Sequence, residues 1–102
     1  MKIKLILAVV ISVSSFSSPA ATRANCENMA NFANTIMFAR QSGVPESKIR
    51  DTAMQNGNSV LRRFTLMLVD AAYLVPVYKS DAAKVNAAED FASEMRTACM
   101  AQ

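Results

Sequence analysis

Two cysteines carry the most reactive side chains in this 102-residue sequence, and their spacing limits what they can do. Cys26 and Cys99 lie far apart, and neither belongs to a C-x-x-C motif of the kind that lowers a thiol pKa. Two cysteines cannot complete a tetrahedral zinc site, and the sequence has no histidine to add to them. The pair therefore predicts a structural disulfide, with an intermolecular bridge or a redox-active pair as the alternatives.

Acidic side chains are the other candidates for chemistry. Glu89, Asp90 and Glu94 cluster near the C-terminus, where paired carboxylates could transfer protons. On a helix, however, Asp90 and Glu94 fall opposite the apolar stripe, which predicts a solvated face. The absence of histidine excludes Ser/His/Asp and Cys/His catalysis, and the only two glycines sit at expected helix ends rather than in a phosphate-binding loop. We therefore predict that the protein is not an enzyme and holds no cofactor or metal.

The first 24 residues have the layout of a secretory signal peptide. A basic segment at 1–4 precedes an apolar run from Leu5 to Val13, and a Ser-rich stretch then ends in small residues at Ala24. The apolar run is nine residues long, whereas a membrane-spanning helix needs about 20. We expect cleavage after Ala24, with Ala20 and Ala21 as alternatives, and a periplasmic or secreted protein with no permanent membrane span.

Removal of 1–24 leaves a single domain at 25–102, and it changes the charge of the chain. Lys2, Lys4 and Arg23 leave with the signal, so 8 of the 11 basic residues remain against 8 acidic ones. A chain of balanced charge has no general attraction for phosphate backbones, so nucleic acid is not an expected partner. A core of this size rarely stabilises a fold by more than ~3–5 kcal/mol, which is a reason to expect the disulfide.

Helical periodicity and its punctuation divide residues 25–102 into four segments, which predicts an all-α fold. Gly43 offers a left-handed stop, and Pro45 is expected at the first helical position of the next segment. Asn58 or Ser59, and later Ser80, can cap free amide groups. Counted with their caps, the expected helices cover residues 26–42, 45–55, 58–74 and 80–99. The disulfide would make the first and last helices antiparallel neighbours in a compact bundle.

The third expected helix has more apolar surface than one buried face requires. The expected core stripe consists of Val60, Phe64, Met67, Leu68, Ala71 and Val75. A second stripe, nearly opposite, consists of Arg62, Leu66, Val69 and Tyr73. Either neighbouring helices cover both stripes, or the second stripe faces water as a ridge that binds a partner; a membrane-surface role is the third alternative.

Short motifs along the chain resemble those of a loose group of small exported proteobacterial proteins of unknown function, some of them associated with prophages. The motifs are Cys26…Ala39-Arg40-Gln41-x-Gly43, Ala72-Tyr73-x-x-Pro76-x-Tyr78-x-Ser80 and Phe91…Cys99. The resemblance implies a helical, disulfide-tied fold, and it implies no catalytic residue.

Two classes of function fit these features. The first is a small exported protein that binds a periplasmic or envelope protein, as an inhibitor, an immunity factor or a modulator. The second is a self-associating structural or chaperone-like stress protein, in which the second stripe pairs with itself. The expected partner is therefore an unidentified protein or a second copy of the chain.

Overall fold

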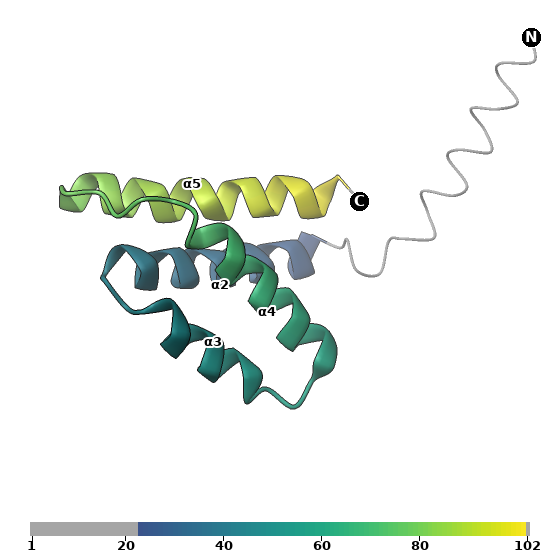
Figure 1. Ribbon diagram of the computed structural model, residues 1–102. Coiled ribbons are helices and arrows are strands. Elements are labelled where there is room, and N and C mark those ends of the chain that lie inside the picture. Colours follow the sequence, from purple (N-terminus) through teal and green to yellow (C-terminus); the bar gives the residue numbers. More distant parts are fainter. Residues whose placement is uncertain (1–22, 102) are drawn as a thin grey trace, which may run out of the picture.

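A computed structural model of the chain describes residues 23–101. It contains four helices, labelled as in Figure 1: α2 (Arg23–Gln41), α3 (Glu46–Met54), α4 (Ser59–Ala72) and α5 (Asp81–Met100). The prediction of an all-α fold with four helices is thus confirmed. The expected signal peptide lies outside the described residues apart from Arg23 and Ala24, which begin α2.

The ends of the helices follow from local sequence signals. Gly43 has a φ of 88°, the left-handed conformation that stops α2. The side chains of Asn58 and Ser80 each accept a hydrogen bond from the backbone amide three residues further on, which caps α4 and α5. The prediction for Pro45 was wrong by one position. Its backbone is extended, with φ −64° and ψ 144°, so it precedes α3 and Glu46 is the first helical residue.

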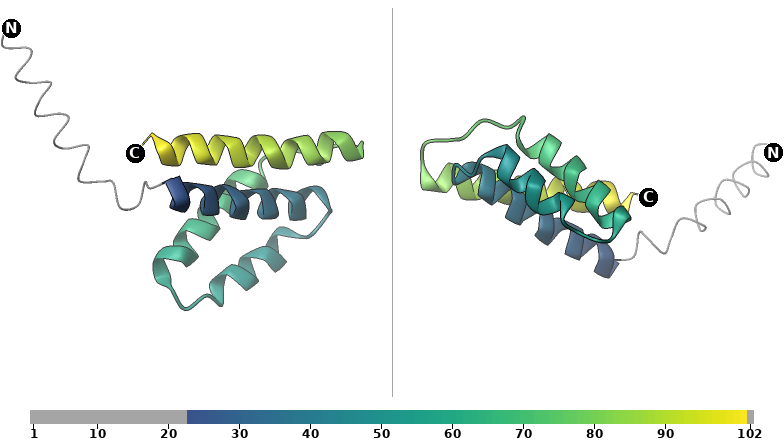
Figure 2. Two further views of the ribbon diagram at one scale, coloured as in Figure 1. Left: turned by 180° about the vertical axis from the view of Figure 1, so that it is seen from behind. Right: turned by 60° about the horizontal axis from the view of Figure 1, so that its bottom comes forward.

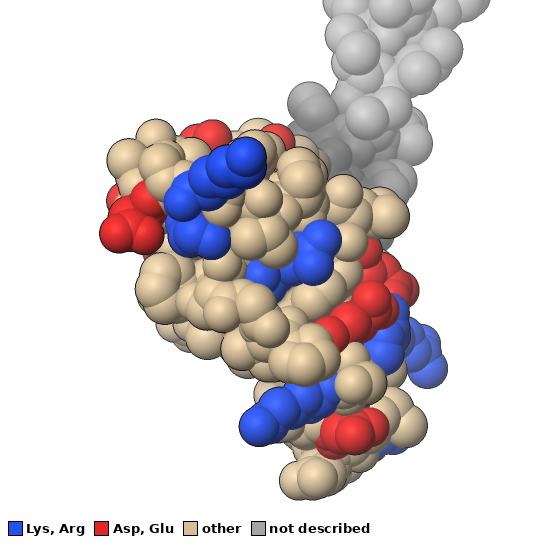
Figure 3. Space-filling view, turned by 60° about the vertical axis from the view of Figure 1, so that its left-hand side comes forward, with Lys and Arg blue, Asp and Glu red and all other residues tan. Residues whose placement is uncertain are grey.

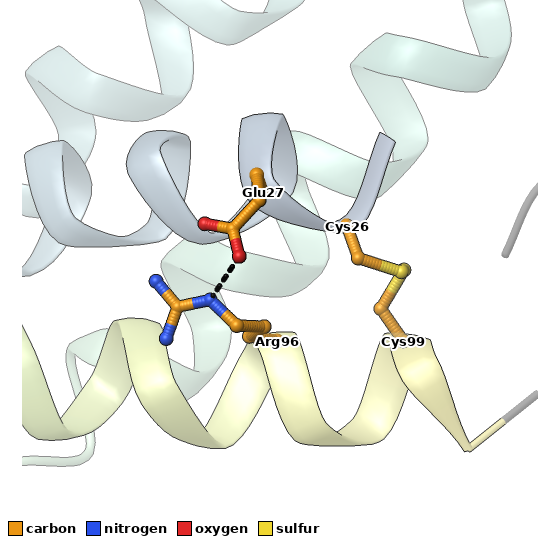
Figure 4. Close-up of a disulfide and its surroundings, with 4 residues drawn as sticks. All are labelled: Cys26, Glu27, Arg96 and Cys99. Carbon is orange, nitrogen blue, oxygen red and sulfur yellow. Dashed lines mark ion pairs between the residues drawn. A yellow bond between two sulfur atoms is a disulfide. The ribbon is translucent and has the colours of Figure 1, made fainter. Parts of the chain in front are cut away.

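Helices α2 and α5 form a long antiparallel pair, which is the most extensive helix–helix contact in the described fold (Figure 1). Cys26, near the start of α2, and Cys99, near the end of α5, form a disulfide with their Cα atoms 5.5 Å apart. Beside it, Arg96 Nε lies 3.0 Å from Glu27 Oε2, so an ion pair joins the same two helix ends (Figure 4). The predicted link between the first and last helices is confirmed.

Helices α3 and α4 run in opposite directions as a hairpin, and α4 crosses α2 on the side away from the viewer in the left panel of Figure 2. The core lies where α2, α4 and α5 meet. Its fully buried members are small or aliphatic residues with one aromatic: Ala33, Ile36, Met37, Leu68, Val69, Ala72, Ala88 and Phe91. Ile49 of α3 packs against this cluster, so the short helix covers its edge.

Candidate functional site

The side of α4 that faces away from the core carries large exposed apolar residues, with the exposed charges of Arg63 and Asp70 beside them. Val60 is 77% exposed, Met67 is 60% exposed, and Leu74, just beyond the helix end, is 86% exposed. Val60 and Met67 are seven residues apart, so they lie almost directly above one another along α4, and Leu74 follows at the same spacing in the turn after the helix. Phe64 and Ala71 flank them and are partly buried against the core. We call these five residues the α4 outer face.

The opposite side of α4 explains why the outer face is left in water. Leu68, Val69 and Ala72 are buried in the core, and Thr65 is buried among them. The Thr65 hydroxyl donates a hydrogen bond of 2.7 Å to the Leu61 carbonyl one turn earlier, so a polar residue can occupy the buried side without an unpaired group. The buried side is therefore centred near Thr65 and Ala72, and the residues half a turn away face solvent.

This orientation corrects the expected core stripe of the third helix. Leu68 is buried, and Phe64, Ala71 and Val75 are partly buried, but Val60 and Met67 are exposed. The physical reason is that α4 has apolar residues on more than one side, so its own sequence does not indicate which of them the neighbouring helices will cover.

The residues of the expected partner-binding ridge hold α4 in place instead of forming an exposed stripe. Val69 is fully buried, and Leu66 is partly buried. Arg62 Nη1 donates a hydrogen bond of 2.6 Å to the Asn56 carbonyl, which ties the first turn of α4 to the preceding loop. The Tyr73 hydroxyl donates a hydrogen bond of 2.6 Å to the carbonyl of Val44, in the loop between α2 and α3. The four residues therefore do not lie together on an open surface.

Burial raises the pKa of the Tyr73 phenol above its ordinary value of 10, because the neutral hydroxyl is favoured where water is partly excluded. The positive charge of Arg40 acts in the opposite direction. Its guanidinium carbon lies 5.0 Å from the centroid of the Tyr73 ring, a cation–π contact between α2 and the end of α4.

A buried glutamine fixes the segment that leads from α4 to α5. Gln41 is 1% exposed. Its Nε2 donates a hydrogen bond of 2.8 Å to the Pro76 carbonyl, and its Oε1 accepts one of 2.9 Å from the Tyr78 amide. The neighbouring Arg40 Nε donates a hydrogen bond of 2.9 Å to the Val75 carbonyl. We call Arg40 and Gln41 the polar clamp, since together they hold the chain just after the α4 outer face against the end of α2.

Gln41 was not predicted to be buried. Arg40 Nε finds its acceptor in the segment after α4, at the Val75 carbonyl. The short motifs named in the sequence analysis contained a signal for this cluster. The residues that meet in it and belong to those motifs are Arg40, Gln41, Tyr73, Pro76 and Tyr78.

Helix α3 is attached to α4 by an arginine between two carboxylates. Arg50 pairs with Glu46 of its own helix at 2.7 Å and with Asp70 Oδ1 of α4. The hydrogen bond to Asp70, followed by that to Glu46, raises the pKa of Arg50 above its ordinary value. These side chains are exposed enough that the pairs add little stability, but they fix the position of Asp70 beside the α4 outer face.

The described part of the surface has hollows that a small ligand could enter, four of which are described below. The largest of the four, about 410 Å³, lies between Phe38, Lys84 and Val85, where α2 ends and α5 begins. A second, about 290 Å³, is lined mainly by apolar residues of α2 and α3, and a third, about 250 Å³, lies on the α4 outer face between Val60 and Met67. The smallest, about 210 Å³, is rimmed by the exposed carboxylates of Asp90 and Glu94.

The charges on one face of the molecule are mixed in sign (Figure 3). Lys and Arg side chains alternate with Asp and Glu side chains on the face shown in Figure 3, with uncharged surface between them. Within residues 23–101, no group of three or more His, Cys, Asp or Glu residues is placed to hold a metal ion. Among the helices of this part of the chain, none is both long enough and apolar enough to cross a membrane.

Comparison of the chain with protein-family models, with curated proteins and with solved structures finds no match.

Proposed function

We propose that this chain is an exported, non-enzymatic helical protein that acts by binding another protein through the α4 outer face. The observation that carries the proposal is the exposure of Val60, Met67 and Leu74 on a helix whose other side is already buried. Fully burying a side chain of this kind contributes about 1.5–3 kcal/mol, so a partner that covers these three gains several kcal/mol from them.

The rest of the fold supports a role in contact. The α4 outer face belongs to a well-fixed helix: Arg62 holds its start, while Tyr73 and the polar clamp hold its end. A surface that is already ordered loses little conformational freedom when it binds, which favours affinity. Such a surface suits two kinds of role: inhibition, immunity or modulation of a periplasmic or envelope protein, and self-association of a structural or chaperone-like protein.

Export is part of the proposal and rests on two features. One is the signal-like layout of residues 1–24, and the other is the Cys26–Cys99 disulfide, since such bonds persist in oxidising compartments.

Site-specific photo-crosslinking in cells tests the proposal. A photoreactive amino acid replaces Met67 in the chain expressed from residue 1, and a control chain carries it in place of Ser93, which is also exposed but lies on a polar side of α5. We expect a crosslinked protein adduct from position 67 and none from position 93. Adducts of equal yield from both positions, or from neither, would contradict the proposal.

A further inference from the structure

The spacing of the α4 outer face has a specific geometrical meaning. Its residues, Val60, Phe64, Met67, Ala71 and Leu74, alternate steps of four and three. This is the heptad pattern by which one helix packs along another with a slight left-handed crossing. Within the described fold, Val60, Met67 and Leu74 of this pattern are exposed, while Phe64 and Ala71 are partly buried along the edge of the core. The face therefore has the form expected for pairing with one more helix.

Charges beside the seam indicate the identity of that helix. Arg63 and Asp70 lie on the same flank of the seam, seven residues apart and of opposite sign, and both are exposed. On the other flank Leu61 is exposed and Leu68 is buried in the core, so that flank offers no charge. If a second α4 lies antiparallel across the seam, Arg63 of each chain comes opposite Asp70 of the other, so two ion pairs form. In a parallel arrangement Arg63 would face the Leu68 flank and would find no carboxylate.

We propose, building on the function proposed above, that the partner of the α4 outer face is a second copy of this chain. The two α4 helices pack antiparallel around a two-fold axis that passes between Phe64 and Met67, with Phe64 of one chain against Met67 of the other. Asp70 Oδ1 already accepts a hydrogen bond from Arg50, so the incoming Arg63 uses the other carboxylate oxygen.

The small area of the proposed α4–α4 contact limits the affinity of the dimer. A helix of 14 residues is about 21 Å long, so the seam buries less surface than a permanent dimer interface does. We therefore expect a reversible dimer with a dissociation constant on the order of 1–100 μM. Because such a dimer dissociates on dilution, the average molar mass of the protein in solution should rise with its concentration.

Sedimentation equilibrium of the purified, oxidised protein, produced from the full chain, provides the test. Met67→Glu places charges in the centre of the seam and is expected to raise the dissociation constant at least about 100-fold, the equivalent of two lost hydrophobic contacts. Met54→Glu is the matched control, since Met54 is 58% exposed on α3 and Met67 is 60% exposed. The control is expected to dimerise as the parent protein does.

A charge exchange tests the antiparallel register. Arg63→Glu alone and Asp70→Arg alone each replace two attractions with two repulsions, which we expect to weaken the dimer about tenfold. The double variant restores opposite charges across the seam and is expected to return to within about threefold of the parent protein. Circular dichroism of each variant checks that the helices are intact, because Asp70→Arg also removes the pair with Arg50.

The outcomes separate this inference from the function on which it rests. A monomeric mass at every concentration, or equal weakening by Met54→Glu and Met67→Glu, would overturn the second copy as partner. Failure of the double variant to recover would overturn the antiparallel register. If the adduct formed at position 67 in cells has twice the mass of the chain, the second copy is supported. An adduct of any other mass would leave the proposed function standing and overturn this inference.

Discussion

Replacing Gln41 by leucine tests the polar clamp, which holds the segment after α4 against the end of α2. Leucine has a similar volume but neither donates nor accepts a hydrogen bond. The variant therefore loses the bond of 2.8 Å to the Pro76 carbonyl and that of 2.9 Å from the Tyr78 amide. Each such bond contributes about 1 kcal/mol net, so the expected loss is about 2 kcal/mol. The residues that are left unpaired are exposed and can bind water, which keeps the cost near this value.

Equilibrium unfolding in urea, followed by far-ultraviolet circular dichroism on the oxidised protein, measures this loss. With a slope of about 1 kcal/mol per molar urea for a small domain, the midpoint should fall by about 2 M while the slope stays unchanged. Gln55→Leu is the control: Gln55 is exposed at the end of α3, and its replacement is expected to change stability by less than about 0.5 kcal/mol. Equal effects of the two substitutions would refute the role assigned to Gln41.

Three further predictions concern the disulfide, Tyr73 and the two glycines. Reduction of Cys26–Cys99, which lie 73 residues apart, should lower the free energy of unfolding by roughly 4 kcal/mol in urea titrations; a loss under about 1 kcal/mol would contradict the account. Because its pKa is raised in the folded state, Tyr73 contributes stability below pH 10 that is lost as the pH rises through the folded pKa. In Tyr73→Phe this pH-dependent loss of stability should be absent when unfolding is measured across the same pH range. Gly43→Ala should lower the free energy of unfolding by about 1 kcal/mol because Gly43 has a positive φ, whereas Gly57→Ala should leave it unchanged or raise it by about 0.5 kcal/mol. Neither added Cβ meets an atom within 4 Å, so only the backbone conformation distinguishes the two positions. Reversed signs in thermal unfolding would count against this explanation.

The parts of the fold that follow from local rules could be predicted from the sequence. Gly43, Asn58 and Ser80 act within one turn of their own position, so the ends of the helices follow from nearby residues. The disulfide could be predicted because only two cysteines are present, which leaves one intramolecular pairing.

The orientation of α4 could not be predicted, because it depends on which neighbours cover the helix. Val69 and Met67 are both apolar, and only the packing of α2 and α5 decides that the first is buried and the second exposed. Thr65 adds to the ambiguity, since its hydroxyl bonds within its own helix and allows a polar residue to be buried. The role of Gln41 could not be predicted for a similar reason. Its hydrogen-bond partners lie 35 and 37 residues away along the chain, and no local sequence pattern connects them to it.

The two pairs of helices differ in how they contribute to the fold. Helices α2 and α5 form a frame that is closed at one end by the disulfide and the Glu27–Arg96 ion pair. Helices α3 and α4 are held against this frame by the polar clamp and by apolar packing, and they present the α4 outer face to solvent. Under the proposed function, the first pair provides rigidity and the second provides contact.

Oxidation of methionines by a short pulse of hydrogen peroxide tests most directly whether the α4 outer face is covered when the protein works. Met67 and Met54 are almost equally exposed, at 60% and 58%, while Met37 is buried and serves as the unreactive reference. In dilute purified protein, Met67 and Met54 should be oxidised at similar rates, as measured by peptide mass spectrometry. In cells that export the full chain, the account predicts that Met67 is oxidised at least about threefold more slowly than Met54. Equal rates for the two methionines in cells as well as in dilute solution would contradict it.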